Sequence, residues 1–206
     1  MKKYLCFCIA ALLFVSCVTA GRTEKYPAML ADVDPFSIGS VKASLDETFS
    51  TSIKETIVEV IFYPRENEVA LEFNNGPALY RQFWGEAGRL QLINALSSYK
   101  EDLANQRLIT SYNRSRDVYG RFNGRFQWKP FSFSATYKAS PVIRLGYRFR
   151  NGSPFISASQ IKAKEETGIN RKGLSESPAY SIYFTLTQGE ELAALFDQAY
   201  LLGLLR

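Results

Sequence analysis

The chain has 206 residues, of which 46% are hydrophobic and 22% charged, a composition typical of a globular protein, and its formal net charge is +5. It contains no histidine, and this excludes Ser-His-Asp and Cys-His catalysis, zinc sites built on histidine, and haem held by an axial imidazole. The three cysteines all lie within the first seventeen residues, so the remainder of the chain has no disulfide, thiolate metal site or catalytic thiol of its own.

The N-terminus has the pattern of an export signal. Two lysines precede an apolar run over residues 4–15, and Ser16 and Cys17 follow it. As a helix this run would be about 18 Å long, which is short of the roughly 30 Å of a membrane's hydrocarbon core. We therefore predict a cleaved signal peptide over residues 1–16 and no permanent transmembrane anchor.

The segment Phe14-Val15-Ser16-Cys17 resembles the lipobox of bacterial lipoprotein precursors, in which the cysteine is acylated through its sulfur and becomes the new N-terminus. The resemblance implies that Cys17 carries a lipid and tethers the protein to a bacterial membrane. Ordinary signal-peptidase cleavage before Gly21 is the alternative. No acidic sorting residue follows the cysteine, which favours the outer membrane, with the domain in the periplasm or at the cell surface.

The mature chain begins with a predicted tether and continues into strands. Residues 17–35 carry the lipidated N-terminus and are polar and mixed, without a sustained period. Residues 55–63 and 69–73 alternate between apolar and polar side chains, and residues 78–84 form a third run, which predicts three strands. After Gly85 apolar residues recur at spacings of three and four, which predicts an amphipathic helix with a stripe of Leu92, Leu96, Tyr99 and Leu103.

The second half alternates more strongly. Asn151-Gly152 is the strongest hairpin signal in the chain, while Asn123-Gly124 is either a tight turn or part of one long strand. Thr187 and Glu190 have the spacing of a capping box that starts a final helix. We predict strands over residues 118–128, 133–138, 143–149, 155–164 and 180–186, and a buried helix stripe of Leu192, Leu195, Phe196 and Ala199.

These elements predict one α+β domain over residues 36–206. The expected architecture is an antiparallel sheet or half-barrel of about eight strands with two packed helices. Since strands and helices follow each other in both halves of the chain, the helices are expected to lie on the sheet.

Positive charge is concentrated in the strand-rich part of the chain. Residues 114–172 contain thirteen Lys and Arg against three acids, a net charge of +10. Strand parity places the arginines on one face of the sheet, which predicts an anion-binding face, because guanidinium groups bind carboxylates and phosphates well. The alternative is that glutamates of the first hairpin neutralise these arginines. The predicted face consists of Arg121, Arg125, Arg144, Arg148 and Arg150.

Two further groups of side chains have a functional and a structural interpretation. Glu55, Glu59 and Glu72 could act as paired carboxylates in hydrolysis, but alternation places them on a solvated strand face. Aromatic residues could line an apolar ligand pocket, although core packing is their more frequent role. These aromatic residues are Tyr80, Phe83, Trp84, Phe126, Trp128, Phe131 and Phe133.

The sequence therefore predicts a non-enzymatic, membrane-tethered envelope lipoprotein that binds an acidic protein or an anionic lipid surface. A carrier of an apolar ligand in a partly closed sheet is the first alternative, and a carboxylate-dependent envelope hydrolase is the second. No pattern predicts a cofactor or a metal, since Asp32-Val33-Asp34 is too short for a calcium or magnesium loop. Nucleic acid is not an expected partner of an exported protein.

Overall fold

The computed structural model describes residues 29–46, 53–110, 116–168 and 174–206. The predicted signal peptide, the lipidation residue Cys17 and most of the predicted tether lie outside these residues. Within them, no helix has the length and apolar character needed to cross a membrane.

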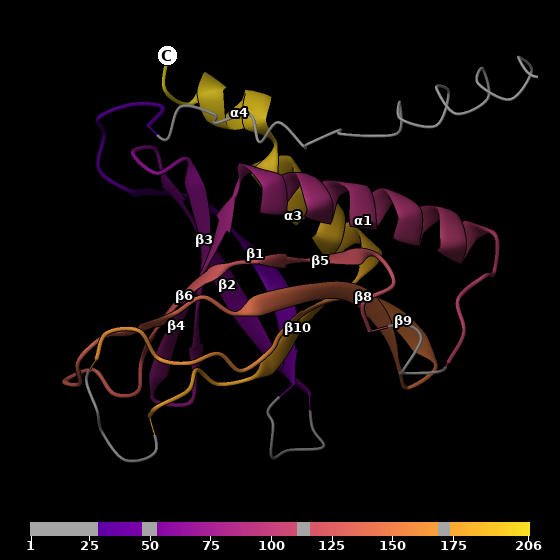
Figure 1. The fold of residues 1–206 in the computed structure, drawn as a ribbon. Helices are drawn as coiled ribbons and strands as arrows, with labels where there is room; N and C mark the ends of the chain where they lie inside the picture. Colours follow the sequence, from indigo (N-terminus) through magenta and orange to yellow (C-terminus); the bar gives the residue numbers. More distant parts are fainter. Residues whose placement is uncertain (1–28, 47–52, 111–115, 169–173) are drawn as a thin grey trace, which may run out of the picture.

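Ten strands of the described residues form a single antiparallel sheet (Figure 1). Their order across the sheet is β5-β8-β9-β10-β1-β2-β3-β4-β6-β7. The strands are β1 (Phe36–Asp46), β2 (Ile53–Tyr63), β3 (Glu68–Asn75), β4 (Ala78–Gly85), β5 (Gly120–Asn123), β6 (Arg125–Lys129), β7 (Tyr137–Ala139), β8 (Val142–Arg150), β9 (Ser153–Gln160) and β10 (Tyr180–Phe184).

The sheet is curved into a half-barrel, and one segment of chain joins its two sides. β5 pairs with β8, whereas β6 pairs with β4 near the opposite end of the strand order. Only Gly124 separates β5 from β6, and its amide donates a hydrogen bond of 2.9 Å to the Pro141 carbonyl beside β8. The two sides of the sheet must therefore approach each other here.

The core fills the concave side of this sheet. Val58, Val60 and Phe62 of β2 are fully buried, as their predicted alternation requires, while Glu55 and Glu59 on the other face are exposed. The same alternation holds on β8, where Ile143, Leu145 and Tyr147 are buried. Burial of such side chains stabilises the fold by about 1.5–3 kcal/mol each.

In the part of the chain that the structure describes, three helices cover one end of the half-barrel: α1 (Glu86–Ala104), α3 (Leu186–Phe196) and α4 (Gln198–Gly203) (Figure 1). α1 packs against α3, and the ring of Phe196 lies 5.3 Å from that of Trp84. The predicted stripe of α1 is buried at Leu92, Leu96 and Tyr99. The end of the half-barrel away from the helices is bounded by loops.

The strand count exceeds the predicted one for two reasons. β1 was not predicted, because its sequence FSIGSVKASLD is rich in small residues and has a weak apolar period. The predicted strand over residues 118–128 is divided by Gly124 into β5 and β6, and the chain runs on without a hairpin. The predicted strand over residues 133–138 is reduced to β7, because residues 131–134 form a turn.

The final helix begins and ends earlier than predicted. Its capping box consists of Thr185 and Gln188, not Thr187 and Glu190. The reason is that β10 ends at Phe184, so the next residue, Thr185, becomes the N-cap of α3. Asp197 then stops α3 and caps α4 through the Tyr200 amide. Leu192 and Phe196 are buried as predicted, but Leu195 is half-buried and Ala199 is exposed because it lies beyond this break.

Candidate functional site

A cavity of about 490 Å³ opens at the end of the half-barrel away from the helices. The starts of β4 and β10 and the end of β6 surround it, together with the loop that leads into β10. Its lining is mainly apolar and aromatic, as is common in small-molecule sites. The lining residues are Ala78, Tyr80, Trp128, Pro130, Lys162, Leu174, Ser175, Glu176, Ser177, Pro178 and Ala179.

A chain of buried amides stabilises the barrel interior beside this cavity. The indole Nε1 of Trp84 donates to Gln82 Oε1 at 3.1 Å, and Gln82 Nε2 donates to Gln160 Oε1 at 3.3 Å. Gln160 Nε2 donates in turn to the carbonyl of Pro178, which lines the cavity. Tyr180 also donates to Gln160, and burial raises the pKa of Tyr180 well above its ordinary value. The chain links β4 to β9 and β10 across the interior.

A second cavity of about 400 Å³ adjoins the first, since Pro130 and Leu174 line both. The loop between β6 and β7 forms its outer wall. Two phenyl rings of this loop, Phe131 and Phe133, stack with centroids 5.6 Å apart and are 49% and 87% exposed. Ser134 holds the turn, because its Oγ accepts from the Phe131 amide and donates to the Phe131 carbonyl.

Tyr137 contributes an unusual group to the second cavity. Its side chain is 0% exposed and its ring stacks on Trp128 at a centroid distance of 5.4 Å. The phenol oxygen has no hydrogen-bond partner among the residues that the structure describes. A buried hydroxyl without a partner is unfavourable by about 1–3 kcal/mol, so such groups are rare in folded proteins.

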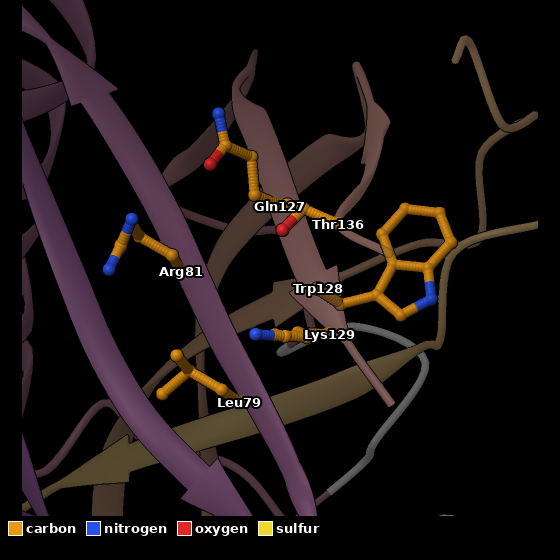
Figure 2. A pocket seen from close by; sticks show the side chains of 6 residues that line it. All are labelled: Leu79, Arg81, Gln127, Trp128, Lys129 and Thr136. Carbon is orange, nitrogen blue, oxygen red and sulfur yellow. The ribbon is translucent and has the colours of Figure 1, made fainter. Parts of the chain in front are cut away.

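A smaller cavity of about 190 Å³ lies on the other side of Trp128, between β4 and β6. Figure 2 shows the amino group of Lys129 directed toward Leu79 and Arg81 of β4. Arg81 is already paired with Glu72. Lys129 makes no ion pair within the described ranges, so it leaves an uncompensated positive charge at this smaller cavity, which shares Trp128 with the first cavity.

Four of the five predicted arginines share the outer face of β5 and β8, as strand parity predicted. The fifth, Arg125, lies on β6 and pairs with Glu68. Its guanidinium lies 3.6 Å from the ring centroid of Phe83, an apolar side chain on the outer face. The guanidinium of Arg125 is therefore already in contact with a carboxylate of β3 and a phenyl ring of β4.

Arg148 and Arg150 are also engaged. Both contact the carboxylate of Asp46, at 3.0 Å and 2.7 Å. The hydroxyl of Tyr183 accepts from Arg148 and donates to the same carboxylate. Neutralisation of part of the arginine face thus comes from Glu68, which belongs to the first hairpin, and from Asp46 of β1, which does not.

Arg121 and Arg144 differ from the other three arginines. They are direct register neighbours on β5 and β8, and neither forms an ion pair with a described carboxylate. The Nε atom of Arg144 is buried without a hydrogen-bond partner in the described structure. Like charges in directly opposed positions are unfavourable, so this pair is where an anion would be most stabilising. Anion binding by the five arginines stays a prediction, now concentrated on these two.

The three glutamates of the hydrolase alternative lie outside the cavities. Glu55 and Glu59 are exposed on β2, and Glu72, which faces Glu59 in register, is paired with Arg81. Asp32 and Asp34 likewise form ion pairs with a single arginine of the β2–β3 turn. Among the described residues, no group of three or more potential metal-ligating side chains occurs.

The aromatic residues divide between the core and the cavities. Trp84 and Phe126 are buried in the core, and Phe83 lies beneath Arg125 on the outer face. The remaining four of the predicted set line the two larger cavities: Tyr80, Trp128, Phe131 and Phe133. The sequence indicated that aromatic side chains could line a pocket, but it did not indicate which of the seven residues line a cavity and which are packed in the core.

Arg89 is a buried polar residue that the sequence analysis missed. It is 1% exposed on α1 and donates to the Asn67 carbonyl at 2.8 Å, to Asn67 Oδ1 at 2.9 Å, to the Trp84 carbonyl at 3.1 Å and to Gln198. Burial lowers its pKa to about 10. Arg89 lies three residues before Leu92 and therefore on the same, apolar side of the helix. This spacing was the signal in the sequence from which its burial could have been predicted.

Fold and site together define an α+β half-barrel protein with ligand-sized apolar cavities at its open end. The chain belongs to the family described as "Uncharacterised Treponema protein", which matches residues 35–202. That match covers nearly all of the described domain. Comparisons with curated proteins and with solved structures give no match.

Proposed function

We propose that this protein is a non-enzymatic, lipid-anchored binding protein of the bacterial envelope, and that its two joined cavities hold an apolar ligand. The observation that carries this proposal is the pair of cavities of about 490 and 400 Å³ that share Pro130 and Leu174. Each has a volume within the range of small-molecule sites. Carrier function, the first alternative from the sequence, is thus favoured over an anionic surface.

Further support comes from the surroundings of the cavities. Phe131 and Phe133 are exposed, although apolar rings are usually buried, and they stand at the wall of the second cavity. The glutamates that a hydrolase would need are on the outer face and not in a cavity. A ligand that enters past the two rings would meet mainly apolar surface, and the one carboxylate of the described lining, Glu176, contacts Lys162 at 3.8 Å.

Binding of diphenylhexatriene, a fluorescent hydrocarbon, tests the carrier proposal. The chain carries Cys17→Ser in this experiment, so that no acyl group of its own competes for the cavities. Leu174→Trp places a larger side chain where the two cavities meet and is expected to weaken binding at least about tenfold. Leu202→Trp is the matched control, because Leu202 is exposed on α4, away from the cavities.

Two results would contradict the proposal. One is that the hydrocarbon does not bind to the unsubstituted cavities. The other is that Leu174→Trp and Leu202→Trp bind it equally well, which would place the ligand elsewhere. Near-UV circular dichroism of both variants shows whether the fold is retained.

The lipid anchor is proposed on the lipobox-like segment alone. Radiolabelled palmitate should enter the native protein and should not enter Cys17→Ser. Label in both proteins, or a mature N-terminus at Gly21, would instead support a secreted, unanchored protein.

Binding to an anionic surface is a second candidate function, favoured by the unpaired neighbours Arg121 and Arg144. Flotation with anionic vesicles should then decrease as salt rises, because exposed charges are screened over about 8 Å at physiological ionic strength. Arg121→Glu with Arg144→Glu should abolish the salt-sensitive fraction, whereas Lys42→Glu with Lys54→Glu, which changes exposed lysines of β1 and β2, should not. Equal loss in both double variants would show that only net charge matters.

A further inference from the structure

We infer that the ligand is an acyl compound, an apolar chain that ends in a carbonyl or carboxylate group, and that the Tyr137 hydroxyl donates a hydrogen bond to its oxygen. The inference rests on the proposed carrier function. It adds the chemical class of the ligand and the residue that recognises its polar end.

The first argument is the unsatisfied hydroxyl. Tyr137 lines the second cavity, its side chain is wholly buried, and its phenol oxygen lacks a partner in the described structure. A buried hydroxyl gains most from a ligand that supplies the missing hydrogen bond. A pure hydrocarbon would leave the group unpaired, so the ligand is expected to carry a polar atom at this point.

The second argument is the charge around the cavities. Lys162 and one acid, Glu176, line the first cavity, whereas Lys129, which makes no ion pair within the described residues, lines the smaller cavity that shares Trp128 with it. Glu176 contacts Lys162 at 3.8 Å with both side chains 60% exposed, an ion pair of little strength. The uncompensated charge beside Trp128 is therefore positive, and because Trp128 stacks on Tyr137, an electron-rich oxygen is favoured at Tyr137 over a cation.

The third argument is the shape of the space. The second cavity, which Tyr137 lines, shares Pro130 and Leu174 with the first cavity, and the lining of the first cavity extends to Ala78 and Pro178. The buried phenol oxygen without a partner therefore lies beside a mainly apolar space, whose charged residues, Lys162 and Glu176, belong to the first cavity. A single acyl chain has this distribution, with a polar end and an extended apolar body.

Competition against diphenylhexatriene tests the inference with two acyl compounds, dodecanoate and methyl dodecanoate. Tyr137→Phe keeps the ring that stacks on Trp128 and removes only the hydroxyl. It should bind the hydrocarbon within about twofold of the unsubstituted protein, and both acyl compounds about fivefold more weakly, as expected for the loss of one hydrogen bond. Tyr200→Phe, on exposed α4, is the matched control and should change neither.

The carbonyl stretch of bound, ¹³C-labelled methyl dodecanoate gives a second measurement that does not depend on affinity. A hydrogen bond from Tyr137 lowers the frequency of this band, and Tyr137→Phe should return it to the value found in a hydrocarbon solvent. A band already at the hydrocarbon value in the unsubstituted protein would overturn the inference.

The outcomes separate the two proposals. Hydrocarbon binding together with unchanged acyl affinities in Tyr137→Phe overturns the acyl inference and leaves the carrier function standing. Failure of the protein to bind the hydrocarbon overturns the carrier function itself. Weakening of dodecanoate alone would identify a free fatty acid as the ligand, and weakening of both compounds would include acyl esters.

Discussion

Replacement of Arg89 by methionine is expected to destabilise the protein by about 3 kcal/mol. The guanidinium holds three elements together, since it lies on α1 and donates to Asn67 in the β2–β3 turn and to Gln198 in α4. Asn67 has a φ of 50°, in the left-handed region that residues other than glycine adopt infrequently. The hydrogen bonds from Arg89 stabilise this conformation of the turn. Methionine retains the apolar stem but donates no hydrogen bond.

The magnitude follows from two opposing effects. Loss of the guanidinium leaves buried oxygens without donors, the two of Asn67 and the carbonyl of Trp84, at about 2 kcal/mol each, or about 6 kcal/mol in all. Removal of the buried charge returns about 3 kcal/mol, because burial lowers the pKa from 12.5 to about 10 and one pKa unit is about 1.36 kcal/mol. The net loss is about 3 kcal/mol.

Urea unfolding measures this loss through the fluorescence of Trp84 and Trp128, the two tryptophans of the chain. Arg107→Met is the matched control, because Arg107 is half exposed and pairs only with surface acids. Its variant should lose no more than about 1 kcal/mol. If Arg89→Met and Arg107→Met have the same unfolding free energy, the buried hydrogen bonds do not stabilise the fold as argued.

Three further perturbations test the packing. Phe196→Ala should destabilise by about 3–5 kcal/mol, because Phe196 is buried against Trp84, and an unchanged denaturation midpoint would show that α3 is peripheral. Gly124→Ala should destabilise by about 1–3 kcal/mol, because its Cβ would overlap the buried Ile143, and Ile143→Val should recover part of the loss. Burial raises the pKa of Tyr99 from 10.0 to about 12, so at Tyr99 the folded state keeps a proton that the unfolded state loses. The contribution of Tyr99 to stability, about 3 kcal/mol, is fully present below pH 10 and is lost as pH rises through 12, so Tyr99→Phe should lose less stability over this range. An unfolding free energy that falls equally between pH 10 and pH 12 in Tyr99→Phe and in the unsubstituted protein would contradict the last prediction.

Local patterns determined much of the fold from the sequence alone. Alternation along β2 and β8 predicts which side chains are buried, because successive residues of a strand point to opposite faces. Asn151 and Gly152 both adopt positive φ, as the predicted two-residue hairpin requires. The stripe of α1 follows in the same way from the helical period.

Features that depend on distant neighbours could not be predicted. The sheet register brings Asp46 to Arg148, 102 residues away, and so decides which arginines are neutralised. Parity indicates the face of each arginine, but it contains no information on the order of strands. Arg121 and Arg144 therefore emerged as an unpaired couple only in the folded chain.

The sequence by itself determined the aromatic and polar composition of this protein, its strand parity, its α+β class and the residues that resemble a lipoprotein signal. Only the tertiary structure decided that the sheet curves until β5 and β6 join its two sides, and that loops far apart in the chain enclose the cavities beside Tyr137 and Leu174. The physical reason is that burial and alternation act between neighbours along the chain, whereas a cavity is the space left when separate segments pack together.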